Sequence, residues 1–562
     1  MRGGRETAMI AGEFDYVVIG AGSSGACVAA RLGEDPTKTT CVLEAGGHDS
    51  HPFIHVPSFV AAAIGRKETN WGFETVPQAG MAGRKIGVPR GKVLGGSGSI
   101  NGMVYFRGHP TDYDDWSDAG CAGWSYAEVL PYFTRTEHNE DHPESVFHGK
   151  DGPINAKVVE NPNQLNYDFM HALASLQFPA CPDFNGPDPE GYGRRQGLIR
   201  DGQRESTAKN MLRPAMERGN VHVQTNAQVA RIIVEDGRAT GVELTDGRVI
   251  RARHEVVLSA GTVQSPQILM LSGIGPAAHL KDMGVEVVHD LPGVGGNYQD
   301  HVASPIHMET SDSTSYGISW KAMPRDVMWF FYYLATRKGP LAGNVFESVA
   351  FLRTDKSLAR PDVQFVFQPA KRLTVKGVPF PVGHGYAISP VALYPKSRGT
   401  IRLASNDPTA APLIDPHLLE EPEDIQPLIR ALKIAREAFA SRPFEKYNGV
   451  EIAPGPECTT DKQWDAYIRE TGYTVHHPVG TCKMGTDDTA VVDPQLRVKG
   501  IKGLRVADAS VMPTVIGGNT NAPCVMIGER CADFILGKPP LPAAELPPES
   551  VARYKPNKAK AA

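Results

Sequence analysis

The sequence predicts an α/β fold, α+β overall, in which a Rossmann-like nucleotide-binding domain is joined to a second domain built on an antiparallel sheet. Three observations predict it. An apolar strand near the N-terminus runs into a glycine turn and a helix, in "FDYVVIGAGSSGACVAARL". Residues 220–260 alternate apolar and polar positions and place Asp-Gly dipeptides between the runs, which is typical of antiparallel hairpins. Residues 305–460 contain further alternating runs, such as "PDVQFVFQPA" and "GYAISPVALYP".

The glycine turn has the spacing of a dinucleotide cradle. Gly20, Gly22 and Gly25 fit the pattern G-x-G-x-x-G, which combines a tight turn, a close approach for a pyrophosphate and tight helix packing. Glycines also serve ordinary turns, so the pattern needs a second feature. Glu44 supplies it, because it ends the next strand nineteen residues after Gly25, where a carboxylate accepts hydrogen bonds from ribose hydroxyls. These residues predict a dinucleotide site and leave NAD and FAD both open.

Composition and charge argue against several classes of protein. The 562 residues are 41% hydrophobic and 22% charged, as in ordinary globular proteins, and they exceed the size of one simple core. The net charge of -5 provides no basic surface for nucleic acid. The cysteines form no CxxC pair and the first residues show no secretory signal, so we expect a cytoplasmic protein. No apolar run reaches the roughly 20 residues of a transmembrane segment.

Longer motifs resemble one known family. The chain contains "VLEAGG", "NWGFETVPQ", "PRGKVLGGSGSINGMVYFRGHPTDYDDW", "LSAGTVQSPQILMLSGIGP", "LPGVGGNYQDH", "HPVGTCKMG" and "LRVADASVMPTVIGGNTNAPCVMIGERCA". Together with the glycine turn, these segments resemble the glucose-methanol-choline (GMC) flavoprotein oxidoreductases from about Phe14 to Leu536. The resemblance implies the GMC fold, with FAD rather than NAD as the cofactor.

The resemblance also implies two interleaved, discontinuous domains. An FAD-binding domain is expected from residues 13–160, 220–305 and 462–537, and a substrate-binding domain from residues 161–219 and 306–461. Residues 538–562 are rich in proline and alanine and end in basic residues, so we expect an extended tail there. The residues before Glu13 are expected to be a disordered lead.

The expected FAD contacts follow the family motifs. By position, "GGSGSINGMV" lies along the isoalloxazine and pyrophosphate, while Val229 meets the adenine. This run offers backbone N–H groups that suit a flat anionic ligand, although a plain surface loop is the alternative. Some family members attach FAD through a histidine in this motif, but Ile100 stands at that place, so we expect non-covalent FAD. The expected cofactor-binding residues are Gly20, Gly22, Ser23, Ser24, Gly25, Glu44, Ala45, Trp71, Gly96, Asn101, Gly102, Met103, Val104, Val229, His476, Asp508, Ala509 and Ala522.

The stretch "TVHHPVGTCKMG" places His476 and His477 directly before a proline. The pair could be metal ligands, a base with a neighbour, or buried structural rings. A residue before proline favours extended geometry, which directs neighbouring side chains to opposite faces and argues against one shared metal. In the family the histidine before "PVGT" is the catalytic base, which implies that role for His477. The resemblance places His476 at the flavin or pocket, with a purely structural role as the alternative.

The family pairs this base with a second His or Asn on the last loop. In "GGNTNAPCVMIGER" we expect Asn521 in that role, with Asn519 as the rival and a capping or turn role as the alternative. A neutral amide there can donate a hydrogen bond to the substrate oxygen as negative charge develops. A metal site at His48, His51 and His55 is not expected, because their loop has no cysteine and no clear helical register.

The expected reaction is the oxidation of a primary alcohol to an aldehyde. Its small-molecule alcohol would pass electrons through FAD to oxygen or to an artificial or physiological redox partner. A hydroxynitrile lyase and a light-driven fatty acid decarboxylase on the same fold are the alternatives. Glu347, in a segment that resembles choline dehydrogenases, could face a cationic substrate. We interpret the aromatic run at residues 329–333 as buried helix packing, with an entrance or a subunit contact as the alternatives.

Overall fold

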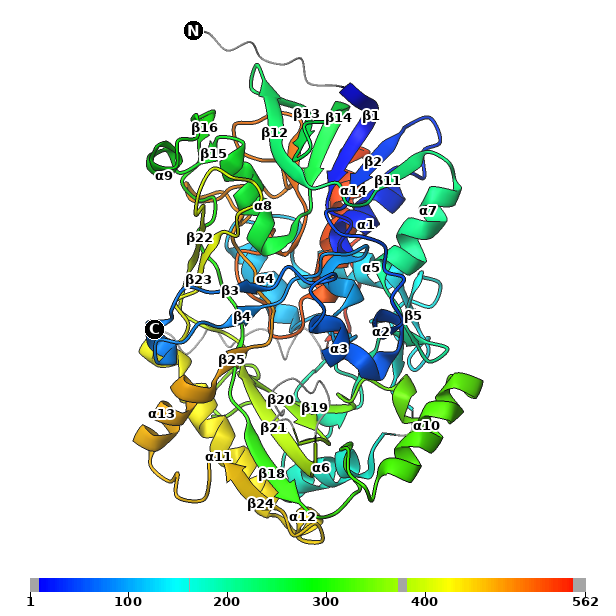
Figure 1. Cartoon of the computed structure of the whole chain (residues 1–562), viewed down its shortest axis with the longest axis vertical. Helices are drawn as coiled ribbons and strands as arrows, with labels where there is room; N and C mark the ends of the chain where they lie inside the picture. Colours follow the sequence, from blue (N-terminus) through cyan, green and yellow to red (C-terminus); the bar gives the residue numbers. More distant parts are fainter. Residues whose placement is uncertain (1–9, 161, 372–381, 549–562) are drawn as a thin grey trace.

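The computed structural model describes residues 10–160, 162–371 and 382–548. The molecule is elongated, and two sheets lie toward opposite ends of its long axis (Figure 1). A seven-stranded sheet takes strands from the start, the middle and the end of the chain, and an eight-stranded sheet takes most of its strands from between them. Residues 1–9 and 549–562 of the expected lead and tail fall outside the described residues. The first strand begins at Ile10, three residues before the predicted start at Glu13.

The seven-stranded sheet is Rossmann-like, because its central strands are parallel. The order is β11-β2-β1-β14, with β26 beside β14, and every one of these pairings is parallel. The antiparallel strands β12 and β13 extend it. Its strands are β1 (Ile10–Ile19), β2 (Thr40–Leu43), β11 (Val221–Gln224), β12 (Val229–Glu235), β13 (Arg238–Leu244), β14 (Val249–Leu258) and β26 (Leu504–Val506). The predicted βαβ unit and hairpins are confirmed.

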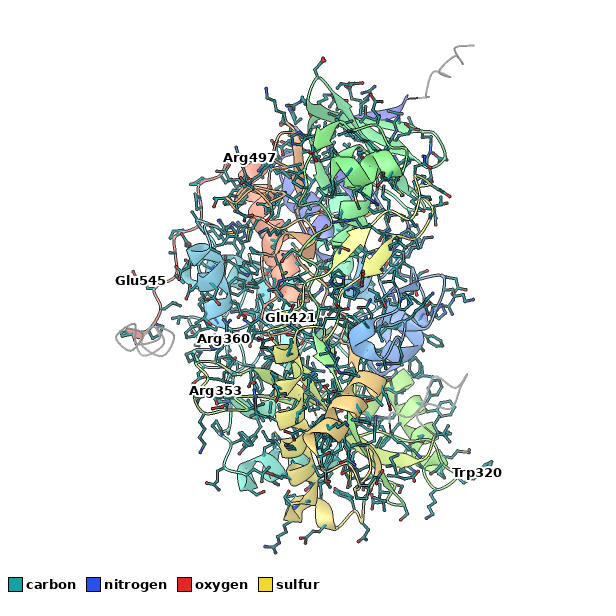
Figure 2. The ribbon with its side chains drawn as sticks, turned by 90° about the vertical axis from the view of Figure 1, so that its left-hand side faces the viewer. Trp320, Arg353, Arg360, Glu421, Arg497 and Glu545 are labelled. Atoms are coloured by element: carbon teal, nitrogen blue, oxygen red, sulfur yellow. The ribbon has the colours of Figure 1, made fainter. Side chains whose placement is uncertain are left out.

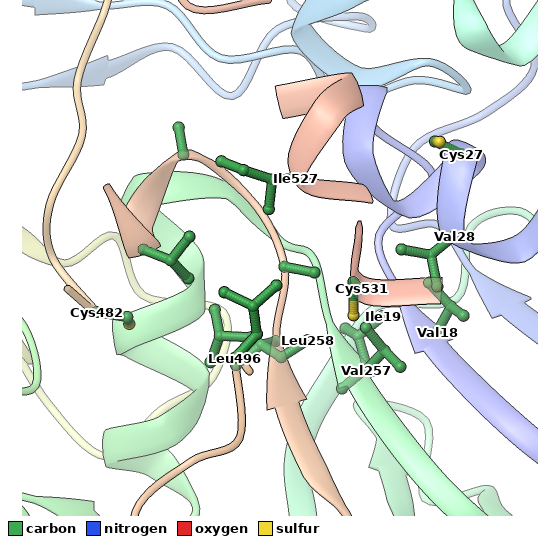
Figure 3. Close-up of a cluster of buried hydrophobic side chains, with 14 of the residues drawn as sticks. Val18, Ile19, Cys27, Val28, Val257, Leu258, Cys482, Leu496, Ile527 and Cys531 are labelled. Carbon is green, nitrogen blue, oxygen red and sulfur yellow. The ribbon is translucent and has the colours of Figure 1, made fainter. Parts of the chain in front are cut away.

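The core of this part lies between the sheet and two helices that are far apart in the sequence. Helices α1 (Ser23–Leu32) and α14 (Asn521–Ile535) pack against each other beside the sheet (Figure 1). Figure 3 shows side chains from β1, α1, β14 and α14 meeting there, and none of them is more than 3% exposed: Val18, Ile19, Cys27, Val28, Val257, Leu258, Ile527 and Cys531. The C-terminal helix thereby fixes the helix that follows the glycine turn.

The eight-stranded sheet is antiparallel, as predicted. The order is β24-β18-β21-β20-β19-β7, and β17 joins β21 to β25. Its strands are β7 (Gly191–Arg194), β17 (Val302–Ala303), β18 (Ile306–Thr310), β19 (Ser348–Leu352), β20 (Val363–Gln368), β21 (His384–Ala392), β24 (Val450–Ala453) and β25 (Tyr473–Thr474). Strands β17 and β25 belong to this sheet although their residues fall within the expected FAD-binding segments. The two-domain division remains a proposal.

Strand β20 shows how the second sheet separates core from cavity. Successive side chains of a strand point to opposite faces. Phe365 and Phe367 are fully buried in the core under α6 (Gln164–Ser175) and α11 (Gln426–Ala440). Gln364 and Gln368, on the opposite face, line a large cavity. On this face the sheet presents polar side chains, together with valines such as Val366, to the space between the two sheets.

The remaining elements connect and cover the sheets. The helices are α2 (Pro52–His55), α3 (Val60–Ile64), α4 (Pro110–Asp118), α5 (Tyr126–Thr136), α7 (Arg213–Glu217), α8 (Gly261–Leu271), α9 (Ala277–Asp282), α10 (Met323–Thr336), α12 (Arg442–Glu445) and α13 (Asp461–Thr471). The short strands are β3 (Phe73–Glu74), β4 (Gly87–Val88), β5 (Glu137–Asn139), β6 (Ile154–Val158), β8 (Gln196–Gly197), β9 (Ile199–Arg200), β10 (Gln203–Arg204), β15 (Ile274–Gly275), β16 (His289–Asp290), β22 (Thr400–Arg402) and β23 (Leu413–Asp415).

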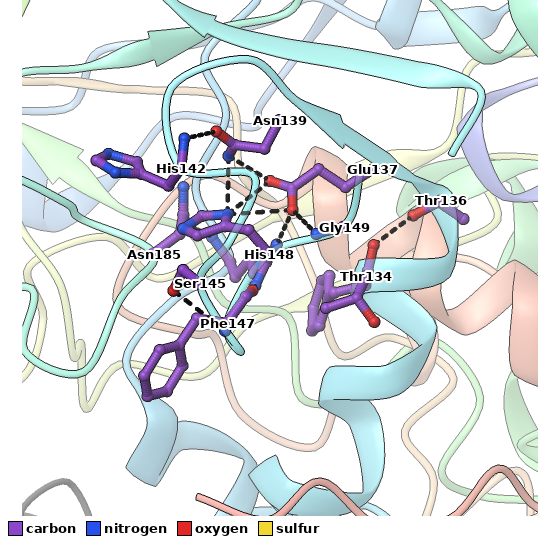
Figure 4. A network of polar contacts seen from close by, with 12 residues as sticks. Thr134, Thr136, Glu137, Asn139, His142, Ser145, Phe147, His148, Gly149 and Asn185 are labelled. Carbon is purple, nitrogen blue, oxygen red and sulfur yellow. Dashed lines mark hydrogen bonds and ion pairs between the residues drawn. The ribbon is translucent and has the colours of Figure 1, made fainter. Parts of the chain in front are cut away.

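A buried polar network fixes the segment after α5. Glu137 accepts hydrogen bonds from Asn139 and from the backbone of Gly149, and His148 contacts the same carboxylate (Figure 4). Arg107 also donates to Glu137, and Nε2 of His148 contacts Asp183. Burial alone would raise the pKa of Glu137, but Arg107 and His148 hold it below its usual value. Each buried charge here has a partner, which is the condition under which burial of ions is tolerated.

The prediction that the aromatic run at residues 329–333 is buried is wrong. Helix α10 leaves Phe330 42%, Phe331 63% and Tyr332 47% exposed, and Tyr333 is its only buried residue. Trp320, just before the helix, projects from the surface (Figure 2) and is 87% exposed. None of the helices in the described ranges combines the length and apolar character that crossing a bilayer requires.

Two glycines of the first turn should respond differently to alanine. A Cβ at Gly25 would lie 2.0 Å from the carbonyl oxygen of Gly20, whereas nothing lies within 4 Å of a Cβ at Gly22. Gly25→Ala should therefore lower the thermal unfolding midpoint, since overpacking costs about 1–3 kcal/mol. Gly22→Ala should unfold as the parent does but bind a dinucleotide more weakly, because its methyl group fills the space a pyrophosphate approaches. Equal midpoints for the two variants would contradict this assignment.

Candidate active site

One cavity of about 390 Å³ lies between the two sheets. A single buried water needs roughly 10–15 Å³ by the same measure, so the space suits an extended ligand. The glycine turn and Glu44 form one part of its wall, and the polar face of β20 forms another. His476, His477 and Asn519 also line this cavity. The cavity thus brings together residues that are hundreds of positions apart.

The N-terminus of α1 opens onto this cavity. Gly22 caps the helix without a side-chain hydrogen bond, so the first N–H groups can face an anion. Glu44 is buried, and its two oxygens accept hydrogen bonds from the backbone N–H groups of Ala21 (3.0 Å) and Gly46 (2.8 Å). Burial raises the pKa of Glu44 to about 7, against the effect of these bonds. The carboxylate is held in place and keeps acceptor capacity for a ribose.

Most of the expected cofactor-binding residues reach the cavity. Those on its wall are Gly20, Gly22, Ser23, Ser24, Glu44, Ala45, Trp71, Gly96, Asn101, Gly102, Val104, Val229, His476, Asp508 and Ala509. Gly25, Met103 and Ala522 do not line it. Gly25 packs against the Gly20 carbonyl, and the side chains of Met103 and Ala522 lie in the hydrophobic core. The open helix N-terminus, the fixed carboxylate and the length of the wall fit FAD.

A chain of hydrogen bonds determines which nitrogen of His477 carries a proton. Nε2 of His301 lies 3.0 Å from the carbonyl oxygen of Leu393, which can only accept, so this nitrogen carries the proton of the neutral ring. Nδ1 of His301 is then an acceptor, and it lies 3.0 Å from Nδ1 of His477, which must donate. Nε2 of His477 is left without a proton, 2.9 Å from Nδ2 of Asn519. The lone pair of Nε2 faces the amide of Asn519 on the cavity wall, so an alcohol reaches it by displacing that contact.

Burial keeps this imidazole neutral. Burial lowers the pKa of His477 well below 6.5, and the positive charges of a protonated neighbour or of Arg90 act in the same direction. Burial likewise lowers the pKa of His301 to about 4. Asp300 holds both histidines by their backbones, because its Oδ1 accepts from the N–H groups of His301 and His477 at 2.8 Å each. The pair is rigid and uncharged at neutral pH.

The contact expected of Asn521 is made by its rival, Asn519. Asn521 is the first residue of α14, and its Nδ2 donates to Oγ of Ser23 at 2.7 Å. That bond ties the C-terminal helix to the glycine turn instead of reaching His477. Asn519 lies two residues earlier in the loop, and its Oδ1 is buried with no hydrogen-bond partner in the described part of the chain. An unsatisfied amide oxygen on a cavity wall is typical of a site that receives a ligand.

His476 differs from the extended geometry assumed for the histidine pair. Its φ is 67°, in the left-handed region, and its carbonyl oxygen accepts from Nη2 of Arg90 at 2.7 Å. Its ring lies near Thr474 while that of His477 faces His301 and Asn519. No group of three metal-ligating side chains occurs in the described residues, and Nε2 of His55 instead contacts a backbone oxygen.

Glu347 does not face the cavity, contrary to the role considered for it. Its carboxylate is 2% exposed and accepts from the backbone of Asn163 (2.9 Å), Nδ2 of Asn166 (2.6 Å) and the hydroxyl of Tyr316 (2.8 Å). These donors satisfy it away from the cavity wall. The carboxylate is thus not available to a cationic substrate.

Sequence reasoning missed Arg90, Arg195, Gln364 and Gln368, which all line the cavity. Arg90 lies within a family motif whose glycines were assigned to the cofactor, so the motif itself could have indicated this arginine as a site residue. The two glutamines occupy alternate positions of a run that was recognised only as a strand. Nothing in the sequence around Arg195 distinguishes it from its neighbour Arg194.

Comparison with known proteins identifies the family of the chain. Two family models described as GMC oxidoreductase match residues 14–303 and 395–528. The chain is 42% identical to an alcohol dehydrogenase (acceptor) of Pseudomonas putida, over 93% of this chain and 96% of that protein. It is also 42% identical to an oxygen-dependent choline dehydrogenase of Rhizobium etli, over 94% of this chain and 96% of that protein.

Solved structures agree with the fold. The pyridoxine 4-oxidase from Mesorbium loti superposes with a TM-score of 0.82 at 31% identity, covering 92% of this chain and 98% of that chain. A formate oxidase superposes with a TM-score of 0.85 at 26% identity, covering 95% of this chain and 99% of that chain. The chain therefore belongs to the GMC oxidoreductase family of FAD-dependent enzymes that act on CH–OH donors.

Proposed function

We propose that this enzyme oxidises a primary alcohol to an aldehyde with His477 as the base. The observation that carries the proposal is the unprotonated Nε2 of His477, which the hydrogen-bond chain from Leu393 through His301 leaves on the cavity side. When bound, FAD supplies the acceptor for the hydride that leaves the carbinol carbon. The chain itself must bind the alcohol, accept its hydroxyl proton and exclude water.

The two polar groups at the reacting oxygen have complementary roles. A hydroxyl that displaces the contact between His477 and Asn519 donates its proton to Nε2 and accepts a hydrogen bond from Nδ2 of the amide. As the proton leaves, negative charge develops on the oxygen, and the amide stabilises it without bringing a charge of its own. Asp300 positions the base through the backbone N–H of His477. The buried wall keeps these interactions strong by excluding water.

We further propose that FAD is held without a covalent bond, since Ile100 lines the cavity and has no nucleophilic atom. The electrons leave for oxygen or for another acceptor, in keeping with the relatives' names, which include both kinds. The same names favour oxidation of an alcohol over the lyase and decarboxylase alternatives.

Replacing the base should stop chemistry and spare the cofactor. His477→Ala should retain FAD but reduce it about 10²- to 10⁴-fold more slowly with an alcohol, the usual contribution of a positioned base. Anaerobic stopped-flow absorbance of the flavin measures the step directly. Added imidazole should restore part of the rate, which a misfolded variant would not show. Reduction of His477→Ala at the parental rate would rule out this base.

The pH dependence should reflect the depressed pKa of His477. The base acts only when unprotonated, and burial lowers its pKa well below 6.5. The rate of flavin reduction at saturating alcohol should therefore stay level from alkaline pH through neutrality, and fall only in acid, below pH 6.5. A rate that falls between pH values of about 8 and 7 would contradict this state of the histidine.

The two loop asparagines should separate chemistry from cofactor binding. Asn519→Ala removes the donor to the developing oxyanion, and loss of one such donor costs about 10²- to 10³-fold in rate. Asn521→Ala breaks the bond to Ser23 and should weaken FAD binding more than it slows hydride transfer. Measured FAD dissociation and single-turnover reduction of both variants test this, and the opposite ranking would restore Asn521 as the partner of His477.

A further inference from the structure

The substrate side of the cavity is lined by polar groups that lack partners. Gln364 and Gln368 on β20 are 3% and 7% exposed, and their side-chain amides make no hydrogen bond within the described residues. On the neighbouring strand, Oγ of Ser389 is buried and likewise unsatisfied there. The two glutamine amides line the cavity and keep their hydrogen-bonding capacity for a polar ligand.

Arg195 is the charged member of this wall. It is 2% exposed, follows the last residue of β7 and lines the cavity. Its Nη2 donates to Oδ1 of Asn344 at 2.7 Å, and its Nη1 donates to the carbonyl oxygen of Gln196 at 3.3 Å. A guanidinium carries five N–H donors, and these bonds use two of them. Within the described residues Arg195 forms no ion pair.

The nearest acid does not neutralise this cation. Glu347 attracts Arg195 at longer range, but its own oxygens are occupied by Asn163, Asn166 and Tyr316. Burial accordingly lowers the pKa of Arg195 to about 9, which still leaves it charged at neutral pH. A buried, unpaired charge is costly, and a ligand of opposite charge would offset that cost.

Neighbouring contacts place the guanidinium beside the reacting region. Asn344, which holds Arg195, also donates to the carbonyl oxygen of Gly102, a residue expected to lie along the flavin. The ring of Phe346 lies 6.0 Å from Cζ of Arg195, and a Cβ at Gly102 would contact the same ring. The cation is therefore close to the segment that flanks the flavin, and it is fixed in orientation.

We propose that Arg195, with Gln364 and Gln368, forms an anion subsite, and that the substrate is an alcohol that also carries a carboxylate. This inference rests on the proposed alcohol oxidation. A guanidinium binds a carboxylate through two parallel hydrogen bonds, and the glutamine amides can donate to it as well. No bond of the carboxylate is made or broken during turnover. The carbinol carbon loses the hydride and the hydroxyl loses its proton to His477, so the product is a carboxylated aldehyde. An alcohol with a trimethylammonium group, such as choline, would instead be repelled by the positive charge of Arg195.

The test compares matched alcohols on the holoenzyme. The first series is para-(hydroxymethyl)benzoate against para-methylbenzyl alcohol, and the second is gamma-hydroxybutyrate against butanediol and choline. The carboxylated member should have the higher kcat/KM in at least one series, by about ten- to a hundredfold, as expected for a hydrogen bond to a charged group. Arg195→Gln should abolish this preference, because it should lower kcat/KM for the carboxylated alcohol, mainly through a higher KM, by more than it lowers kcat/KM for the neutral partner.

Two further variants and a binding measurement make the test specific. Arg194→Gln is the matched control, because the neighbouring arginine contacts the carbonyl of Val159 and does not line the cavity; it should keep the preference. Arg195→Lys should keep part of the preference for the carboxylated alcohol, because it keeps the positive charge. Para-toluate, which has no hydroxyl, should perturb the flavin absorbance of the oxidised parent and bind at least about tenfold more weakly to Arg195→Gln.

The outcomes separate this inference from the proposed function. If neutral alcohols reduce the flavin and carboxylated ones are no better, only the anion subsite is wrong. An equal loss on neutral and carboxylated alcohols in Arg195→Gln, or a shifted flavin reduction potential, would overturn it by showing that Arg195 serves the fold or the cofactor. If no alcohol reduces the flavin, the proposed oxidation fails, while para-toluate binding still decides whether the anion subsite exists.

Discussion

The contact between the Nδ1 atoms of His301 and His477 is the interaction on which the site depends. The carbonyl oxygen of Leu393 fixes the proton of His301 on Nε2, and the contact between the two rings then fixes the proton of His477 on Nδ1 and leaves its Nε2 unprotonated. Without this contact either nitrogen of His477 could carry the proton, and a neutral ring protonated at Nε2 could not accept one from the alcohol at that atom. His301, Leu393 and His477 come from separate segments of the chain. The fold must therefore bring these segments together before His477 can act as a base.

The charges around the cavity are arranged asymmetrically. The buried acids on its wall accept hydrogen bonds from the protein: Glu44 from two backbone N–H groups, and Asp508 from Gly261 and Ser265. The arginines Arg90 and Arg195 have no carboxylate partner within the described residues. Asp300 and Glu347 attract these two guanidinium groups only at longer range, so each keeps N–H donors for a ligand on the cavity wall. Donors of this kind suit a negatively charged ligand.

Sequence patterns predicted the parts of the structure that rest on local geometry. The glycine turn, the acid that follows it and the antiparallel sheet each have a short-range cause, so spacing and alternation were sufficient. The choice between Asn519 and Asn521 was not local, because it depends on where the loop ends and α14 begins. His476 shows the same limit, since its backbone is left-handed and its carbonyl oxygen accepts from Arg90, which lies 386 positions earlier in the chain. The exposure of α10 depends on neighbours that no pattern in the helix reveals.

The depressed pKa of His477 has a chemical consequence beyond keeping the ring neutral. A base whose pKa lies far below the working pH is always available, but it accepts a proton with little driving force. The stabilisation of the developing oxyanion must therefore come from another group, and Asn519 is the neutral donor in contact with the same nitrogen. A carboxylate in its place would raise the pKa of the histidine and oppose negative charge on the oxygen. An amide avoids both effects, and so the weak base and the neutral donor are suited to each other.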